Sequence, residues 1–284
     1  MYKTAKHYIM LLRPHQWLKN LLLFFPPFFG GKLLDRASLA VLIPSFLSFS
    51  FAASCGYIIN DIKDRDVDRH HAAKKERPIV RGDISLIAAS IIAAVLYVTA
   101  MIVAGSVSAE FEGYLIIYLF ISFLYTMYLK NVVIVDIFIL ALGFLVRVKA
   151  GGEAFNIEVT KWLFLTVFVI ALFLAAGKRL GERICMGDDA RKHRKCLNEY
   201  SPSFLEGILW FCASAALVSY ALYTIENKIG MFYTVPLAAF GLIRYIYIVK
   251  EGKGDPTEAL LKDRQIMITA IVWVLMIGSI LYRR

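Results

Sequence analysis

The sequence is dominated by long apolar runs that contain few or no charged residues. A membrane-spanning helix needs about 20 consecutive, mostly apolar residues. Six windows have no charge: Ala37–Asn60, Ile84–Ala109, Gly113–Leu129, Trp162–Gly177, Gly207–Ile225 and Gln265–Tyr282. Three more are interrupted by a few charges or by a proline pair: Leu18–Leu34, Asn131–Ala150 and Ile229–Val249. The pattern predicts an all-α, polytopic membrane protein with nine transmembrane helices, forming a single integral membrane domain over residues 1–284.

The composition agrees with a membrane protein and excludes two common classes. Hydrophobic residues make up 59% of the chain and charged residues 19%, whereas soluble domains carry about 25% charged residues. We therefore exclude an ordinary water-soluble enzyme and a disordered regulator. The first apolar run contains Pro26–Pro27 and lacks a small-residue cleavage site, so we expect no cleavable signal peptide. The four cysteines lack metal-site or framework spacing, and we expect them to be packing residues or free thiols.

The positive charges are concentrated in a few loops. The chain has 32 Lys and Arg against 22 Asp and Glu, a net charge of +10, which in a soluble protein would suggest a nucleic-acid partner. Most of the basic residues fall in segments that a nine-helix topology places on one side: Met1–Asn20, Asp61–Arg81, Lys130, Lys178–Lys195 and Lys250–Arg264. The positive-inside rule makes that side cytoplasmic. We therefore expect a bacterial-type plasma (inner) membrane protein with a cytoplasmic N-terminus, cytoplasmic active-site loops and no nucleic-acid partner.

An acidic cluster follows the second apolar run. It reads Asn60-Asp61-Ile62-Lys63-Asp64-Arg65-Asp66-Val67-Asp68. If the helix continues past the membrane surface, Asn60, Asp61, Asp64 and Asp68 lie within one arc of about 100°, and Asp66 lies outside it. Carboxylates on one face repel each other unless a cation lies between them, and oxygen-only ligands favour Mg²⁺. The alternative is a solvated helix end, in which Lys63 and Arg65 pair with Asp64 or Asp68.

The same residues carry a family resemblance. The pattern Asn60-Asp61-x-x-Asp64-x-x-x-Asp68, followed by Lys74 and Arg77-Pro78, resembles the first aspartate-rich motif of the UbiA-type intramembrane prenyltransferase superfamily. The resemblance implies nine helices around a central cavity, with cytoplasmic motif-bearing loops after the second and sixth. It also implies that Asn60, Asp61, Asp64 and Asp68 are catalytic residues that hold Mg²⁺.

The second motif loop departs from the superfamily pattern. Members that transfer a prenyl group from a diphosphate usually carry a second Asp-x-x-x-Asp there, whereas this chain reads Gly177-Lys178-Arg179-Leu180-Gly181-Glu182-Arg183. Lys178 and Glu182 share a helical face, and Lys and Arg bind phosphate oxygens directly. Together with Arg13–Asn20, Tyr125…Lys130 and Asp255-Pro256-x-Glu258-x-x-x-x-Asp263-Arg264, this loop resembles the decaprenyl-phosphate phosphoribosyltransferase branch.

The branch resemblance implies a reaction and its substrates. We expect transfer of 5-phosphoribose from phosphoribosyl diphosphate to a decaprenyl-like polyprenyl phosphate, with the lipid acceptor entering from the bilayer. The implied substrate-binding residues are Lys19, Lys74, Arg77, Tyr125, Lys130, Lys178, Arg179 and Glu182. Arg13, Gln16 and Asp136 are further candidates. The alternative for the basic residues is that they anchor the loops by the positive-inside rule.

Several residues have open alternatives. Asp136 and Arg147 lie within a predicted span, where charges usually face the bundle interior. They could pair with neighbouring helices, or Asp136 could contact the acceptor phosphate. The basic run Arg191–Lys195 is interpreted as a lipid-surface patch. His70 and His71 are expected beside the acidic face or in solvent rather than as metal ligands.

Three other functions remain to be distinguished. An aromatic prenyltransferase of the same superfamily would transfer a polyprenyl group from its diphosphate to a quinone precursor such as 4-hydroxybenzoate, but it should carry the second Asp motif. A transporter should gather its polar residues near the membrane midplane. A nucleic-acid or membrane-scaffold protein would leave the carboxylate spacing without a role. The sequence leaves the oligomeric state and the prenyl chain length open.

Overall fold

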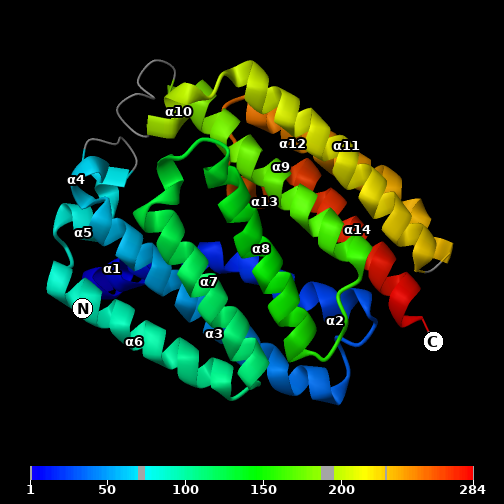
Figure 1. Ribbon diagram of the computed structural model, residues 1–284, viewed down its shortest axis with the longest axis horizontal. Coiled ribbons are helices and arrows are strands. Elements are labelled where there is room, and N and C mark those ends of the chain that lie inside the picture. The colour runs from blue at the N-terminus through cyan, green and yellow to red at the C-terminus, as the bar shows by residue number, and fades with distance from the viewer. Residues whose placement is uncertain (1, 70–73, 187–194, 228, 284) are drawn as a thin grey trace. The chain divides into compact units, whose positions relative to one another are not determined.

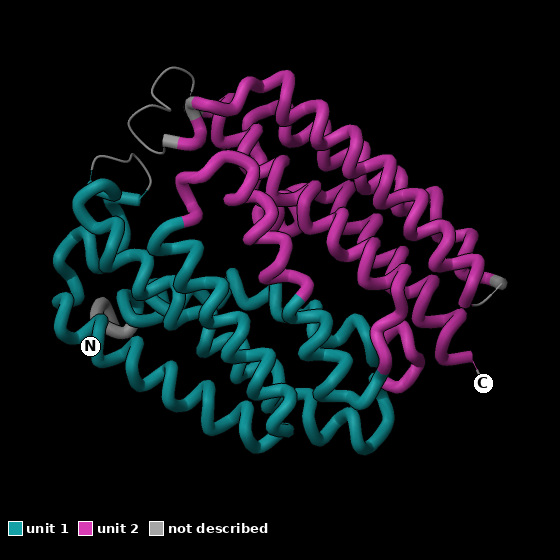
Figure 2. Tube along the Cα trace, in the orientation of Figure 1, with its two compact units in different colours: residues 1–27, 33–128, 146–157 teal, residues 28–32, 129–145, 158–284 magenta. Residues whose placement is uncertain are grey.

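The computed structural model describes residues 2–69, 74–186, 195–227 and 229–283. Within these ranges the chain forms α-helices, short 3₁₀ segments and turns, with no strand, which confirms the all-α prediction (Figure 1). Four of the five residues of the basic run Arg191–Lys195, together with His70 and His71, lie outside the described residues. The chain divides into two compact units (Figure 2): unit 1 has residues 1–27, 33–128 and 146–157, and unit 2 has residues 28–32, 129–145 and 158–284. The single-domain expectation stays a prediction.

Unit 1 is built around long apolar helices that follow one another in the chain. They are α3 (Arg36–Lys63), α6 (Leu86–Gly105) and α7 (Ala109–Met127). The shorter elements are α1 (Tyr2–Leu12), the 3₁₀ segment η1 (Pro14–Phe24), α4 (Arg65–Asp68), η2 (Lys74–Glu76) and α5 (Pro78–Arg81). The ring of Phe49 on α3 lies 5.5 Å from the ring of Phe111 and 5.4 Å from that of Tyr118. Ser85 and Ser108 begin α6 and α7 because each hydroxyl accepts a hydrogen bond from a first-turn backbone N–H.

Unit 2 contains most of the helices from the second half of the chain. They are α9 (Lys161–Met186), α10 (Lys195–Glu199), α11 (Pro202–Glu226), α12 (Val235–Lys250), α13 (Pro256–Lys262) and α14 (Arg264–Tyr282), with 3₁₀ segments η3 (Leu129–Asn131) and η5 (Ile229–Thr234). α8 (Val135–Ala154) begins in unit 2, and its residues from Val146 onward belong to unit 1. The buried side chains of α9, α11 and α12 form one core, within which the Thr166 hydroxyl donates a hydrogen bond to the Ser219 hydroxyl over 3.1 Å.

Seven helices of the described chain are long and apolar enough to cross a membrane, so the predicted count of nine is not confirmed. Two predicted spans account for the difference. Leu18–Leu34 is divided between η1 and the short α2 (Phe25–Phe29), because Pro26 and Pro27 lack an N–H and fit only the first turn of a new helix. The span predicted at Asn131–Ala150 is helical as α8, but its charges, including Asp136, Arg147 and Lys149, make it too polar for the same criterion.

Candidate active site

The acidic motif of unit 1 forms a carboxylate cluster with basic residues from distant segments. We use the name carboxylate cluster for Asp61, Asp68, Arg13, Lys74 and Arg77. Asp61 is 1% exposed, and each of its carboxylate oxygens lies 2.6 Å from Nη2 of Arg13. Nη1 of Arg77 lies 2.9 Å from Oδ1 of Asp61 and also donates to Oδ2 of Asp68. Nζ of Lys74 lies 3.7 Å from Oδ1 of Asp68. Three predicted basic residues therefore converge on two predicted carboxylates.

The backbone brings these carboxylates together in a different way from the one predicted. The shared arc was predicted for a helix that continues past the membrane surface, but α3 ends at Lys63 and Asp64 takes φ −90° and ψ 3° before α4 begins. Asp64 N–H still donates to the carbonyl of Asn60, and Asp68 N–H donates to that of Asp64, over 2.9 and 2.8 Å. The helical spacing therefore persists through a local break, and Arg77 joins the residues on its two sides. Asn60 and Asp64 are half-buried beside them.

Arg13 reaches Asp61 from an unusual backbone conformation. It has φ 52° and ψ 56°, the left-handed region that non-glycine residues adopt only at a cost of about 1–3 kcal/mol. Its guanidinium also lies 5.3 Å from the centre of the Tyr57 ring, within cation–π range. The bonds to Asp61 and the ring contact offset this strain. Of the other two candidates on the same segment, Nζ of Lys19 donates to Oε1 of Gln16 over 2.6 Å.

Arg147 anchors η1 from the last turns of α8. Its side chain is buried, with Nε 2.8 Å from Oδ1 of Asn20 and Nη2 3.0 Å from the hydroxyl of Tyr118. A methyl group on Gly151 would lie 2.1 Å from the carbonyl oxygen of Leu23, so only glycine permits this close approach of α8 and η1. Arg147 therefore makes the structural pairing with neighbouring segments that was expected of it, and it holds the segment that follows Arg13 in place.

The carboxylate cluster has donors that suit Mg²⁺, although its carboxylates are paired with basic side chains. Among the described residues, no group of three or more His, Cys, Asp or Glu is arranged to hold a metal ion. The donors present on the motif are nevertheless all oxygens, and Mg²⁺ in proteins commonly takes only one or two carboxylates together with substrate phosphates. Burial lowers the pKa of Arg77 from its ordinary value, and the Asp61 carboxylate opposes that shift. The donor chemistry therefore fits a magnesium ion shared with a phosphorylated ligand.

Unit 2 has its own buried ionic group, which we call the Arg179 cluster: Arg179, Asp136, Glu182 and Tyr200. Arg179 is 1% exposed and Asp136 is fully buried, with Nε and Oδ2 2.6 Å apart. Nη1 of Arg179 also donates to Oε2 of Glu182 over 2.8 Å, and the Tyr200 hydroxyl donates to Oδ1 of Asp136 over 2.7 Å. The structure therefore favours the pairing alternative for Asp136 over contact with an acceptor phosphate. Arg179, expected to bind substrate directly, is enclosed by protein groups instead.

Tyr200 was not predicted, and its position explains why the Arg179 cluster forms. The Tyr200 oxygen accepts a hydrogen bond from the backbone N–H of Ile134 over 2.6 Å. Ile134 has φ 69°, which is rare and strained for a β-branched residue. One tyrosine thus fixes both the strained turn before α8 and the carboxylate of Asp136.

Two other predicted substrate-binding residues lie in different units. Lys130 on η3, in unit 2, is 8% exposed, and its backbone carbonyl accepts a hydrogen bond from the Cys196 thiol over 3.3 Å. Tyr125 is half-buried on α7, in unit 1.

Lys178 is held by Asp255, a residue distant from it in the sequence of unit 2. Its ammonium lies 3.0 Å from Oδ2 of Asp255, and Oδ1 of Asp255 accepts from the backbone N–H groups of Thr257 and Glu258 at the start of α13. The Lys178 side chain is 35% exposed, whereas the Arg179 side chain is 1% exposed. Asp255 was noticed only as part of a branch pattern. Its partnership with Lys178 could not be predicted, because the two residues are 77 positions apart.

Two glycines allow the loop before α13 to contact α9. A methyl on Gly181 would lie 2.4 Å from the backbone nitrogen of Gly254, and a methyl on Gly177 would lie 2.6 Å from a ring carbon of Tyr245. The Tyr245 hydroxyl in turn donates to the carbonyl of Gly254 over 2.8 Å. Glycines spaced by four on a helix are the common sequence signature of such close approaches in membrane proteins. This spacing was the one signal that could have located the contact.

We expect Gly181→Ala to lower the melting temperature of the detergent-solubilised protein. Alanine normally favours a helix by about 1 kcal/mol over glycine, but overpacking here should cost about 1–3 kcal/mol or more. Gly207→Ala on α11 is the matched control, because a methyl there meets no atom within 4 Å, and it should leave the melting temperature unchanged or raised. A Gly181→Ala protein that melts at or above the wild-type temperature would contradict the close contact.

Comparison with known proteins places the chain in a family. The profile of the UbiA prenyltransferase family matches residues 24–279. This range includes the acidic motif, Lys178 on α9, six of the seven membrane-length helices in full and all but the last three residues of the seventh, α14. The chain belongs to the UbiA prenyltransferase family. With that family and seven apolar helices of membrane-spanning length among its described residues, it is a multi-pass membrane protein.

Individual relatives extend over nearly the whole chain. The decaprenyl-phosphate phosphoribosyltransferase of Mycolicibacterium smegmatis is 32% identical, with 96% of this chain and 92% of the relative aligned. The protein of the same name from Corynebacterium glutamicum is 30% identical, with 96% and 86% aligned. A solved UbiA homologue from Archaeoglobus fulgidus, bound to GPP and Mg²⁺, shares the fold at a TM-score of 0.77 and 22% identity, covering 97% of this chain and 99% of the other. The resemblance to the UbiA superfamily that the motifs predicted is confirmed.

Proposed function

We propose that this UbiA family member transfers 5-phosphoribose from phosphoribosyl diphosphate to a polyprenyl phosphate of the decaprenyl type and releases diphosphate. The full-length similarity to proteins named decaprenyl-phosphate phosphoribosyltransferase supports this substrate pair. The observation that carries the proposal is the second motif, which was expected in a loop and lies on α9. There the chain presents the partly exposed side chain of Lys178, held by Asp255, where the prenyltransferase pattern has a second pair of carboxylates.

The proposed chemistry is a displacement at C1 of the ribose. The bond from C1 to the diphosphate oxygen breaks, and an oxygen of the polyprenyl phosphate forms the new bond to C1. Asn60, Asp61, Asp64 and Asp68 would hold Mg²⁺, which supplies charge neutralisation for the departing diphosphate. The acceptor phosphate is already anionic near neutral pH, so the reaction requires no strong general base.

The basic residues of the carboxylate cluster have a defined part in this proposal. Arg77 is fixed by bonds to Asp61 and Asp68, and Arg13 is fixed by two bonds to Asp61. A guanidinium held in this way has further N–H groups that can bind phosphate oxygens without reorientation, which is how fixed donors stabilise developing negative charge. Lys74 extends the same positive edge beside Asp68. In unit 2 we assign phosphate binding to Lys178 and a positioning role to Arg179 and Glu182.

The assay that tests the proposal follows the label from donor to lipid. The purified protein is incubated with Mg²⁺, phosphoribosyl diphosphate labelled in its ribose and a polyprenyl phosphate, and the products are partitioned between solvent phases. Label should enter the lipid phase, and EDTA should abolish the transfer. Label that stays in the aqueous phase would contradict the proposal. Transfer from a polyprenyl diphosphate to 4-hydroxybenzoate in a parallel reaction would then identify an aromatic prenyltransferase.

We also propose that the N-terminus and the motif loops face the cytoplasm of a bacterial inner membrane. The support is the distribution of basic residues, because loops rich in Lys and Arg remain on the cytoplasmic side. The exposed Cys185, which lies on α9 just after the second motif, offers a direct readout. A membrane-impermeant thiol reagent should label it in inverted vesicles and not in intact cells.

A further inference from the structure

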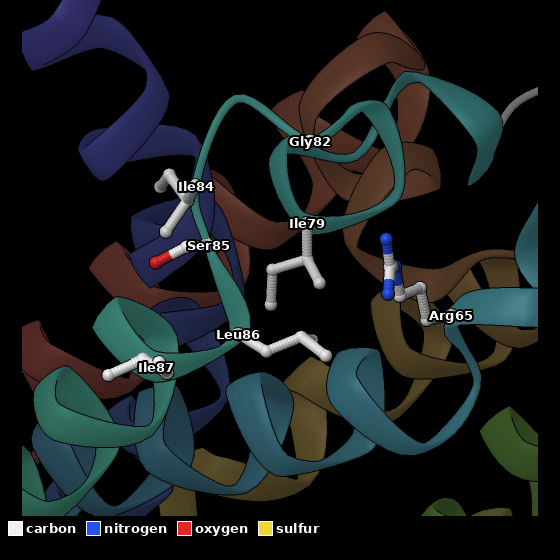
Figure 3. A pocket seen from close by; sticks show the side chains of 7 residues that line it. All are labelled: Arg65, Ile79, Gly82, Ile84, Ser85, Leu86 and Ile87. Atoms are coloured by element: carbon white, nitrogen blue, oxygen red, sulfur yellow. The ribbon is translucent and has the colours of Figure 1, made fainter.

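A pocket in unit 1 lies outside the carboxylate cluster. It has a volume of about 450 Å³ and is formed where α4, α5 and the start of α6 meet (Figure 3). Its apolar lining comes from Ile79, Ile84, Leu86 and Ile87. Its polar side chains are those of Arg65 and Ser85. The pocket is therefore mostly apolar, with one positive charge at one side and a hydroxyl at the other.

Arg65 supplies a charged donor that the described part of the chain leaves unsatisfied. Its Nε is buried, and it makes no hydrogen bond to any residue in the described ranges. A buried donor of a charged group without a partner is destabilising, which favours a ligand that brings an acceptor. The neighbouring Arg69 differs, because it pairs with Asp66 over 3.4 Å in an exposed position. The pocket therefore has the electrostatic character of an anion site.

The start of α6 points to the same ligand chemistry. Ser85 lines the pocket on the side opposite Arg65 (Figure 3), and its hydroxyl already accepts from the N–H of Ala88, so its own O–H is the group left to donate. The N-terminus of a helix also carries partial positive charge that favours an anion. Asp83, the acidic group of this loop, is paired with Arg81 over 3.2 Å and with His7 over 3.8 Å. That carboxylate is therefore engaged away from Arg65.

The exposed apolar surface that continues from the pocket along α6 favours a lipid over a free anion as the occupant. Ile87 at the pocket is 75% exposed, and farther along α6 Ile91 is 59% and Ile102 is 69% exposed. α6 is one of the membrane-length helices, and only 17% of its apolar window is buried by protein. Bilayer chains cover such a surface in a membrane protein. An occupant that matches both parts has a phosphate at the pocket and hydrocarbon chains beside α6.

We propose that this pocket binds the headgroup of an anionic bilayer phospholipid, with its phosphate on Arg65 and its chains along the exposed face of α6. Arg65 begins α4, and the same short helix ends at Asp68 of the carboxylate cluster. A bound lipid therefore links α4, the helix that carries Asp68, to α6. The site is separate from the residues assigned to the reaction, and the proposal stands whether or not the proposed phosphoribosyl transfer is correct.

The test compares lipid-dependent stability in two arginine variants. Full-length protein is reconstituted in nanodiscs of phosphatidylcholine alone or with phosphatidylglycerol, and the melting temperature is measured in each. The wild type should be stabilised by phosphatidylglycerol, and Arg65→Gln should lose that increment. Arg69→Gln, which removes the same charge four residues away, should retain it. Native mass spectrometry should show that Arg65→Gln binds phosphatidylglycerol at least about tenfold more weakly.

A second variant controls for a general effect of the Arg65→Gln substitution on folding. Leu86→Trp places a larger side chain at the pocket, where Leu86 is 39% exposed, and should keep the melting temperature in phosphatidylcholine while losing the phosphatidylglycerol increment. Equal losses in Arg65→Gln and Arg69→Gln would show a diffuse charge effect and overturn the proposal. It would also be overturned if inorganic phosphate in phosphatidylcholine nanodiscs reproduced the full increment, because the site would then bind a free anion.

Discussion

Replacing Asp61 with asparagine is expected to reduce turnover by at least about 100-fold while the protein remains folded. Asparagine preserves the size of the side chain and one acceptor oxygen, but it removes the charge that faces Arg13 and Arg77 at 2.6 and 2.9 Å. Without that charge the motif loses its most buried carboxylate as a metal ligand, and both guanidinium groups lose the anion that orients them. Initial rates of lipid labelling under saturating donor measure the loss.

Asp66→Asn is the matched control for Asp61→Asn. Asp66 belongs to the same acidic run, but its side chain is 86% exposed and its ion pair is with Arg69. Its loss should change the rate by less than a factor of about two, because exposed ion pairs contribute little. Wild-type turnover in Asp61→Asn, or an equal loss in both variants, would remove the basis for assigning the carboxylate cluster to catalysis.

Asp136→Asn is expected to cause the largest loss of stability, about 3–5 kcal/mol in the free energy of unfolding. Asp136 is fully buried and accepts hydrogen bonds from Arg179 and Tyr200 over 2.6 and 2.7 Å. Asparagine leaves the buried guanidinium with Glu182 as its remaining carboxylate partner in the Arg179 cluster. Denaturation of the detergent-solubilised protein, followed by circular dichroism, measures the change.

Glu206→Gln provides the comparison for an exposed ion pair in the same unit. Glu206 lies 3.2 Å from Lys250, and the two side chains are 37% and 47% exposed. Solvent screens such a pair, so we expect a change within about 0.5 kcal/mol. If Asp136→Asn were as mild as Glu206→Gln, the Arg179 cluster would not be a buried ionic core, and a substrate role for Arg179 would regain support.

Much of the helical architecture could be predicted from the sequence because apolar length alone determines a spanning helix. The predicted window Gln265–Tyr282 corresponds to α14, which begins one residue earlier at Arg264. The windows failed where local chemistry opposed a regular apolar helix. Pro26 and Pro27 end one helical segment and start another, and the mean hydropathy of a window does not detect such a break.

The functional residues could be predicted only in part, because spacing reports neighbours along one helix and not partners from other segments. The acidic motif indicated the carboxylates, and the structure places Asp61 and Asp68 against one arginine. The contact between Arg13 and Asp61 joins residues 48 positions apart and depends on a left-handed backbone at Arg13. Nor does the sequence distinguish an enclosed Arg179 from a partly exposed Lys178, since adjacent residues on a helix point in directions about 100° apart.

Lys63 shows that the acidic motif is also a structural joint. It occupies one of the unspecified positions between Asp61 and Asp64, and its ammonium lies 3.0 and 2.7 Å from the carbonyl oxygens of Thr126 and Met127. Those carbonyls belong to the last turn of α7, where carbonyl oxygens have no intrahelical N–H partner. The motif therefore cannot be transplanted as four acidic and amide residues alone. A designed scaffold that borrows residues 60–68 must also provide a helix terminus for this lysine, or replace it with a side chain that needs none.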